Sequence, residues 1–130
     1  MAEGKRLPNI RQHVDAILGA SYEQYDCWAL TRYLLQAGLG LDIVTNPEEA
    51  AQQLREVWAQ GDPRDPQGLV QPWDFLIFVT RGMVTSHLGL VIDGVSFVHT
   101  RETCGVCEER IGSRLWLPRL FQIGRLRMLM

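Results

Sequence analysis

The apolar residues change their period near the middle of the chain, and this change limits the folds that the chain can adopt. Before the loop at 61–68 they recur at helical spacing, as Ile10, Val14 and Ile17 do. After this Gly- and Pro-containing loop they form short apolar runs of strand length. Helices followed by strands predict an α+β domain in which the helices pack on an antiparallel sheet.

Three helices are expected in the first half, each from the residues at its ends. The first covers 8–19 and ends at Gly19. The second begins after Asp26, whose carboxylate can accept a hydrogen bond from a first-turn amide, and ends at the glycines of 38–40. The third is expected over 46–61, because its first residues, Asn-Pro-Glu-Glu, combine a cap, a first-turn proline and a capping box.

The second half is expected to supply the sheet. Its strands are predicted at 74–79, 87–92 and 95–100, with less definite ones at 105–111 and 119–129. A chain of 130 residues suits one domain, which we expect to cover 1–130.

Composition excludes several classes of function. The net charge of −2 argues against nucleic-acid binding, which is typical of basic chains. No apolar run approaches the roughly 20 residues that cross a bilayer, so no membrane partner is expected. The basic start of the chain has no apolar segment behind it, as a secretory signal would, so we expect a cytoplasmic protein as synthesised. Three cysteines favour reduced thiols over a disulfide framework.

Cys27 directly follows the expected helix cap Asp26. Free amides and the helix dipole at this position favour a thiolate, so we expect the pKa of Cys27 to be lowered. The same amides could stabilise an oxyanion formed when the thiolate attacks a carbonyl. Cys27 is therefore the candidate nucleophile, although a cysteine on an apolar helix is more often a core residue.

A cysteine nucleophile needs an imidazole base and a group that orients the imidazole. His87 and His99 could fill both roles if their strands place them on one face. A two-residue turn at Asp93-Gly94 would put them on opposite faces. A three-residue loop over 92–94, with Gly94 left-handed, would place His87 directly opposite His99, and we predict this loop. His13 has no such partner.

Three segments together resemble the NlpC family of papain-like cell-wall cysteine peptidases. They are "DCWALTRYLL", "PWDFLIFV" and "SHLGLVIDGVSFVHT". The resemblance covers roughly residues 20–128, and the tail after the last histidine is similar to the compact branch found in phage tail-assembly and prophage peptidases. It implies a papain-like fold with the nucleophile at a helix N-terminus.

The resemblance also implies an activity. Family members hydrolyse the amide between D-γ-glutamate and diaminopimelate or lysine in peptidoglycan stem peptides, without a cofactor or metal. Carried over, Cys27 is the nucleophile, His87 the base and His99 the residue that orients it. A tyrosine before the cysteine often points at the catalytic centre in this family, and Tyr22, or failing that Tyr25, is its counterpart and the candidate for substrate binding. Phage tail proteins are implied as partners and the virion as a location.

Departures from the family pattern concern specificity more than chemistry. The usual Gly-Gly before Asp26 is replaced by "EQY". Ala29 and Trp73 each stand where the family has glycine, and larger side chains there could narrow the cleft.

Two other classes of protein compete with a peptidase. His99, Cys104 and Cys107 could bind zinc, with His87 or Cys27 as the fourth ligand, which would abolish a hydrolase site. The Cys-x-x-Cys pair could alternatively be redox-active, but it is not at a helix start. The chain could also be a non-catalytic phage tail component that kept the fold.

Overall fold

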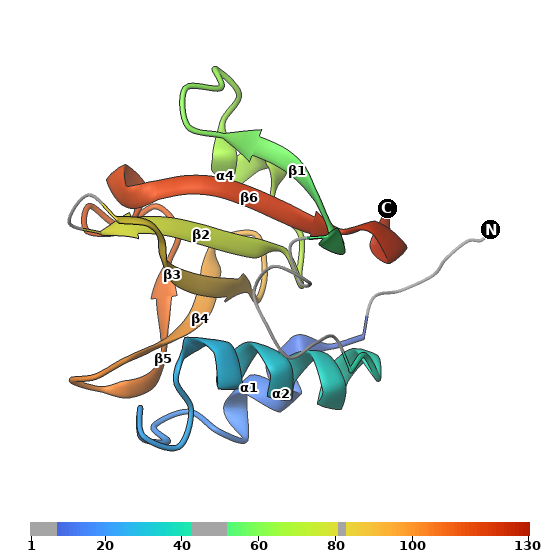
Figure 1. The fold of residues 1–130 in the computed structure, drawn as a ribbon, viewed down its shortest axis with the longest axis vertical. Helices are drawn as coiled ribbons and strands as arrows, with labels where there is room; N and C mark the ends of the chain where they lie inside the picture. Colours follow the sequence, from blue (N-terminus) through green and yellow to red (C-terminus); the bar gives the residue numbers. More distant parts are fainter. Residues whose placement is uncertain (1–7, 43–51, 81–82) are drawn as a thin grey trace.

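A computed structural model describes residues 8–42, 52–80 and 83–130, and it shows helices packed against a six-stranded sheet. The α+β prediction is therefore confirmed (Figure 1). The helices are α1 (Ile10–Asp15), α2 (Cys27–Leu39) and α4 (Pro66–Leu69), with the short 3-10 helices η1 (Leu117–Arg119) and η2 (Arg127–Leu129). The strands are β1 (Leu54–Ala59), β2 (Phe75–Thr80), β3 (Met83–Val91), β4 (Ser96–Arg101), β5 (Gly105–Arg110) and β6 (Leu120–Leu126).

Side-chain caps start the two N-terminal helices, and that of α2 is the predicted Asp26. Helix α1 is shorter than the predicted 8–19, because it ends at Asp15 and is followed by turns up to Gly19. Asn9 accepts a hydrogen bond from the amide of Arg11 at the start of α1. Asp26 accepts one from the amide of Ala29 at the start of α2. Gly40 ends α2 in the left-handed conformation. Local side-chain chemistry thus fixes where α2 begins, and this places Cys27 in its first position.

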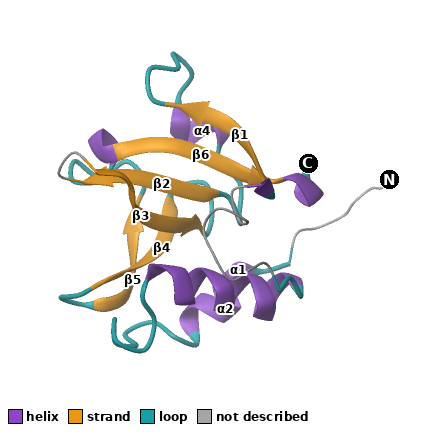
Figure 2. Ribbon diagram, viewed as in Figure 1, coloured by secondary structure: helices purple, strands orange, loops and turns teal. Residues whose placement is uncertain are grey.

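The strands pair antiparallel in the order β1-β6-β2-β3-β4-β5. Helices α1 and α2 lie together on one side of this sheet, and β4 and β5 run steeply across β2 and β6 (Figure 2). One face contributes Phe75, Leu90 and Val98 to the core under the helices. The other face contributes a second core around Phe78, Phe97 and Trp116. Among the described residues, no helix combines the length and apolar character needed to cross a membrane.

The third predicted helix is wrong over its second half. Residues 54–59 form strand β1, which pairs with β6, and Trp58 is buried in the second core. The residues expected to begin that helix, 46–51, lie outside the described residues. The sequence of β1 has no strong strand signal, so its pairing with β6, more than 60 residues away, decides its conformation.

The connection between β3 and β4 has three residues, as predicted, but it is displaced by one position. Leu90 pairs with Val98 and Val91 with Phe97, so the loop is 93–95. Gly94 is not left-handed. Instead, the carboxylate of Asp93 holds the loop by accepting hydrogen bonds from the amides of Val95 and Ser96 and from the Ser96 hydroxyl, each 2.9 Å long.

Trp73 does not narrow a cleft, contrary to our expectation. Its ring is fully buried and packs on Gly38, eleven residues along α2 from Cys27 and hence about 16 Å from it. The Trp73 indole donates to the carbonyl of Pro8 at 2.9 Å. Its φ of 77° is in the left-handed region, where glycine is usual. The chain thus keeps the glycine-like backbone at this position and uses the side chain to fill the core.

Candidate active site

Cys27 lies at the N-terminus of α2, where the start of the helix is held by two hydrogen bonds. Asp26 Oδ1 accepts from the Ala29 amide at 2.8 Å, and the Thr31 hydroxyl donates to the Cys27 carbonyl at 2.8 Å. The Cys27 side chain is half-buried and its thiol is free. The backbone amides of Leu88, Cys27 and Trp28 act on this thiol. Since Leu88 follows His87, Cys27 lies against the strand that carries the proposed base.

His87, His99 and Glu109 form a hydrogen-bonded chain across three neighbouring strands. His87 Nε2 lies 2.6 Å from His99 Nδ1. His99 Nε2 is hydrogen-bonded to a carboxylate oxygen of Glu109. His99 is fully buried, and a quarter of the Glu109 side chain is exposed. The structure therefore brings together the two histidines predicted from the sequence and adds a carboxylate to them.

The acceptor at the end of this chain fixes where the protons are. A carboxylate only accepts hydrogen bonds, so His99 Nε2 carries a proton and donates it to Glu109. The neutral His99 ring then accepts at Nδ1, so His87 Nε2 is the donor in the bond between the rings. Neutral His87 consequently has its lone pair on Nδ1. That lone pair is what a base for Cys27 requires.

Trp116 covers the two histidines. Its ring stacks on His87, with centroids 5.1 Å apart and an interplanar angle of 19°, and meets His99 edge-on at 4.8 Å. Phe78 also contacts both His87 and Trp116. Trp116 is itself only 6% exposed. These rings hold the imidazoles in place and keep water from one side of the pair.

Burial gives the site a neutral resting state. It lowers the pKa of His87 to about 4, with a smaller contribution from the charge of His99. It also lowers the pKa of His99, against the opposing effect of Glu109. Burial and the charge of Asp26 raise the pKa of Cys27, and they outweigh the three backbone amides. The expected lowering of the pKa of Cys27 is therefore wrong. Burial and the capping carboxylate destabilise the thiolate more than the backbone amides stabilise it.

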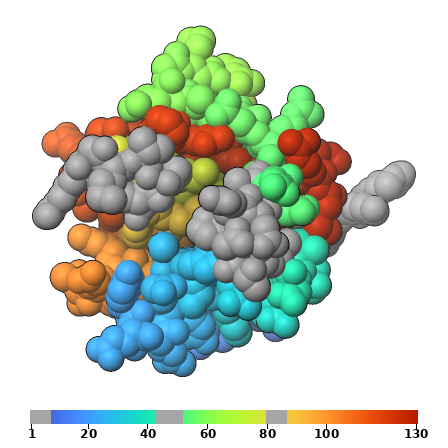
Figure 3. All heavy atoms as spheres, viewed as in Figure 1, coloured from blue at the N-terminus to red at the C-terminus, as the bar shows by residue number. Residues whose placement is uncertain are grey.

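An open pocket of about 500 Å³ lies between the loop before α2 and the hairpin of β4 and β5. It is lined by Gly19, Ser21, Tyr22, Glu23, Glu102, Thr103, Cys104 and Gly105. The two segments adjoin in Figure 3, where the blue surface meets the orange one. They are joined by a hydrogen bond of 2.8 Å from the Val106 amide to the Ala20 carbonyl.

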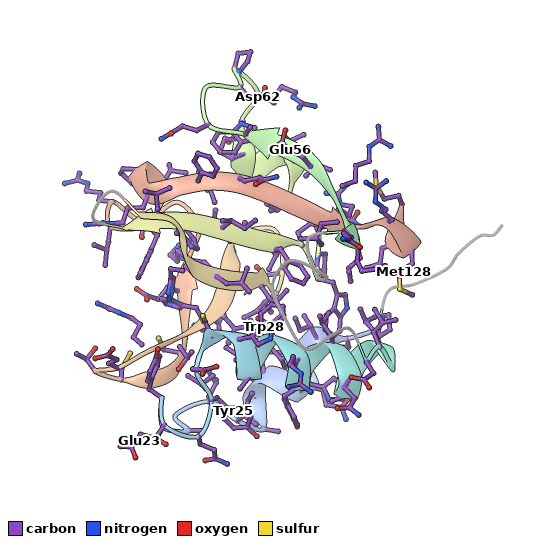
Figure 4. The ribbon with its side chains drawn as sticks, in the orientation of Figure 1. Glu23, Tyr25, Trp28, Glu56, Asp62 and Met128 are labelled. Atoms are coloured by element: carbon purple, nitrogen blue, oxygen red, sulfur yellow. The ribbon has the colours of Figure 1, made fainter. Side chains whose placement is uncertain are left out.

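Tyr22 connects this pocket with the candidate nucleophile. Burial raises the pKa of Tyr22, and the charges of Cys27 and Asp26 raise it further, so the phenol is within electrostatic reach of Cys27. Tyr25, the second candidate, packs against Tyr33 with ring centroids 5.6 Å apart. Figure 4 shows Glu23 and Tyr25 in the loop before α2 and Trp28 in its first turn. Tyr22 lines the pocket, and Tyr25 is not among its lining residues.

The other two cysteines lie on the β4–β5 hairpin beside His99. Cys107 pairs directly with His99 across the two strands, and Cys104 Sγ is 3.3 Å from Cys107 Sγ. Burial and Cys104 raise the pKa of Cys107 to about 12. The sequence suggested that His99, Cys104 and Cys107 could bind zinc in place of forming a peptidase site, with His87 or Cys27 as the fourth ligand. In the structure Glu109 is the acidic residue next to this group, with its carboxylate 4.0 Å from Cys107 Sγ.

Sequence reasoning missed Glu109 and Trp116. Glu109 could have been found from the register of the β4–β5 hairpin, because Phe97 pairs with Glu109 and His99 with Cys107. These alternate residues share a face of the sheet. Trp116 belongs to an irregular segment before η1, and the sequence carries no signal for its position over the histidines.

Comparison with known proteins identifies the family and the fold of the chain. The sequence model of the NlpC/P60 family matches residues 17–125. The chain belongs to the NlpC/P60 family. Among solved structures, the crystal structure of a protein described as similar to an NLP/P60 family lipoprotein, from Staphylococcus aureus subsp. aureus Mu50, has the same fold, with a TM-score of 0.66 and 16% identity. A search of curated proteins gave no match.

The structural match covers 91% of this chain and 40% of the staphylococcal chain, so this chain spans less than half the length of that relative. The predicted family and fold are confirmed. Membership supports a cell-wall peptidase type of function in general terms. The phage-tail branch and the cytoplasmic or virion location stay predictions.

Proposed function

We propose that this NlpC/P60 chain is a cysteine peptidase that hydrolyses the amide between D-γ-glutamate and diaminopimelate or lysine in peptidoglycan stem peptides. The observation that carries the proposal is the chain of hydrogen bonds from His87 through His99 to Glu109, beside a helix start that carries Cys27. An oriented imidazole with a free Nδ1, on the strand whose Leu88 amide acts on the Cys27 thiol, fits the arrangement of a general base and its nucleophile.

In the first half of the reaction, the Cys27 proton passes to Nδ1 of His87 as sulfur attacks the carbonyl carbon. The resulting imidazolium donates through Nε2 to His99, which is held by Glu109. The carbonyl oxygen becomes an oxyanion, which free amides at the start of α2 can stabilise. Breakdown of this intermediate breaks the C–N bond. His87 then gives its proton to the leaving amine, and a thioester on Cys27 remains.

In the second half, His87 removes a proton from water as the water oxygen attacks the thioester carbon. The C–S bond breaks, and the proton on His87 returns to the thiolate of Cys27. The products are a carboxylate and the free enzyme, and no cofactor takes part in either half. Tyr22 and the pocket beside it are the proposed binding region for the stem peptide.

The proposal is tested with a synthetic stem peptide of sequence L-Ala-D-γ-Glu-meso-diaminopimelate-D-Ala. Mass spectrometry of the products should show cleavage at the γ-glutamyl amide. Cys27→Ala should abolish cleavage, because sulfur forms the covalent bond. Tyr22→Phe should mainly raise KM, whereas Tyr25→Phe, the matched control, should leave both kinetic parameters near wild type. Cleavage that survives in Cys27→Ala would refute the proposal.

A further inference from the structure

His99, Cys107 and Glu109 place three different metal-binding atoms close together. Their ligand atoms, an imidazole nitrogen, a sulfur and a carboxylate oxygen, all lie within 4.8 Å of one another. His99 and Cys107 are direct partners across β4 and β5, and Glu109 is two residues further along the same face. The sheet itself therefore holds this group together.

The donor set suits zinc. Zinc binds sulfur at about 2.3 Å and nitrogen or oxygen at about 2.0–2.2 Å, so ligand atoms of a tetrahedral site are about 3.3–3.8 Å apart. The widest pair in the group needs to contract by about 1–1.5 Å to reach this spacing, whereas His99 Nε2 and the Glu109 carboxylate, which are hydrogen-bonded, need to move apart to admit the ion. Glu109 is partly exposed and can adjust its carboxylate. Cys104 is exposed, and its sulfur is already 3.3 Å from that of Cys107, so it is available as the fourth ligand.

We propose that His99, Cys107 and Glu109, with Cys104 as the fourth ligand, form a zinc site that inhibits the enzyme. This inference rests on the proposed function for the inhibition, but not for the binding. It differs from the zinc alternative raised by the sequence, because Glu109 replaces His87 or Cys27 as a ligand. Cys27 and His87 therefore remain as the nucleophile and base of a peptidase, and the metal acts on the residues behind them.

Inhibition follows from where zinc would leave the protons. Zinc on Nε2 of His99 displaces the proton that this nitrogen donates to Glu109. The ring stays neutral, so its single proton is then on Nδ1, taken from His87 Nε2, while the displaced proton passes through the solvent to Nδ1 of His87. His99 would then donate to His87 Nε2, which becomes the acceptor. Neutral His87 must in that case carry its own proton on Nδ1. That nitrogen can no longer accept the proton of Cys27, so the attack on the carbonyl is blocked.

Zinc binding also has a defined proton balance. Each cysteine thiol that binds the ion loses its proton to the buffer, and His99 binds in its neutral form. No oxidant or reductant is consumed. The reaction is reversed by a chelator, which returns the protons to the sulfurs and the Glu109 carboxylate to His99.

The test uses the full chain, reduced with a phosphine and freed of metal, and titrates it with zinc chloride and separately with cobalt chloride. We expect stoichiometric zinc, a thiolate-to-cobalt charge-transfer absorption, and loss of stem-peptide cleavage that a chelator restores. Cys107→Ser should weaken zinc binding at least about tenfold and keep the metal-free activity, because Cys107 takes no part in the reaction. Cys104→Ser should weaken zinc binding to a similar extent, measured by the loss of the cobalt absorption. Arg110→Ser, on the same strand and outside the proposed ligand set, should behave as wild type.

Three results would overturn the proposal. They are the absence of the charge-transfer band, equal zinc inhibition in wild type and Cys107→Ser, and stoichiometric binding without inhibition of an active enzyme. Equal inhibition in the variant would show that zinc acts at Cys27 instead. Failure of the proposed function can be told apart from failure of the zinc site. If the proposed function is wrong, the metal-free protein does not cleave the stem peptide, but the cobalt absorption still appears.

Discussion

His87 Nε2 lies 2.6 Å from His99 Nδ1, although the register of β3 and β4 does not place these residues directly opposite one another. Continuing the pairing of Leu90 with Val98 by one step puts Gly89 opposite His99. A Cβ at Gly89 would come within 2.7 Å of the ring of Phe97. The missing side chain at Gly89 therefore lets the rings of the second core pack closely beside the two histidines, which meet diagonally across the strands.

Replacing Glu109 should impair the reaction without unfolding the protein. Glu109→Gln keeps a hydrogen-bonding side chain beside His99 but removes the charge that fixes its tautomer. We expect kcat/KM to fall on the order of 100-fold, since the imidazole is then misoriented for part of the time. We also expect the pH profile of kcat/KM to change shape, which a purely structural role would not produce.

Glu108→Gln is the matched control for Glu109→Gln. Glu108 belongs to the same strand but binds Arg11, at 2.5 and 2.8 Å, away from the histidines. Its replacement should leave kcat/KM near wild type. Equal losses in the two variants would contradict the role assigned to Glu109.

Gly38→Ala should destabilise the protein because of Trp73. A Cβ at Gly38 would lie 2.1 Å from Cη2 of Trp73, whose ring is fully buried and bonded to Pro8. Overpacking of this kind costs about 1–3 kcal/mol, which exceeds the gain of up to about 1 kcal/mol from replacing a helical glycine with alanine. Urea unfolding measures the difference. Gly94→Ala, where a Cβ meets no atom within 4 Å, should change stability by less than about 0.5 kcal/mol.

Stability should fall as the pH is lowered from 7 towards 4. The pKa of His87 is about 4 in the folded protein against an ordinary 6.5, so between these values the unfolded chain binds a proton that the folded one does not. The free energy of unfolding then decreases by up to about 1.4 kcal/mol per pH unit for this group. Urea midpoints at several pH values measure the slope, which should be smaller in His87→Asn. An unchanged slope in that variant would show that His87 is not responsible.

The thiol of Cys27 should be alkylated slowly at neutral pH in the absence of substrate. In the Cys104→Ser/Cys107→Ser background it is the one remaining thiol. Because burial and Asp26 raise its pKa, the rate with iodoacetamide should keep rising with pH above 9. A constant, high rate between pH 5 and 8 would instead indicate a thiolate paired with an imidazolium at rest.

The parts of the fold that depend on local chemistry could be predicted from the sequence. Asp26 starts α2 through its side chain, and Gly40 ends it through its left-handed backbone. The position of Cys27 in the first turn was therefore predictable. Strand β1 was not, because helix signals precede it and its pairing with β6 is long-range. Whether His87 and His99 share a face depends only on whether the loop has an odd number of residues. The prediction that they share one is therefore correct, although the predicted register was displaced.

Sequence motifs predicted which residue types form the site, but not the contacts that these residues make in the fold. The register is set by the Asp93 carboxylate, which accepts from the amides of Val95 and Ser96, a local turn motif that loop length alone does not specify. Glu109 was not predicted because the strand that carries it, 105–111, has a weaker signal in the sequence than the strands of the two histidines. The effect of burial on the pKa of Cys27 depends on packing around α2, which a helix dipole argument leaves out.

The protonation of the two histidines is the most direct test of the account. Ring nitrogen-15 spectra at pH 7 of the metal-free protein, assigned with His87→Asn and His99→Asn variants, report which nitrogen of each ring carries a proton. The account predicts neutral rings, with the proton on Nε2 in both His87 and His99 and with Nδ1 of His87 unprotonated. A doubly protonated His87, or a His87 proton on Nδ1, would contradict it.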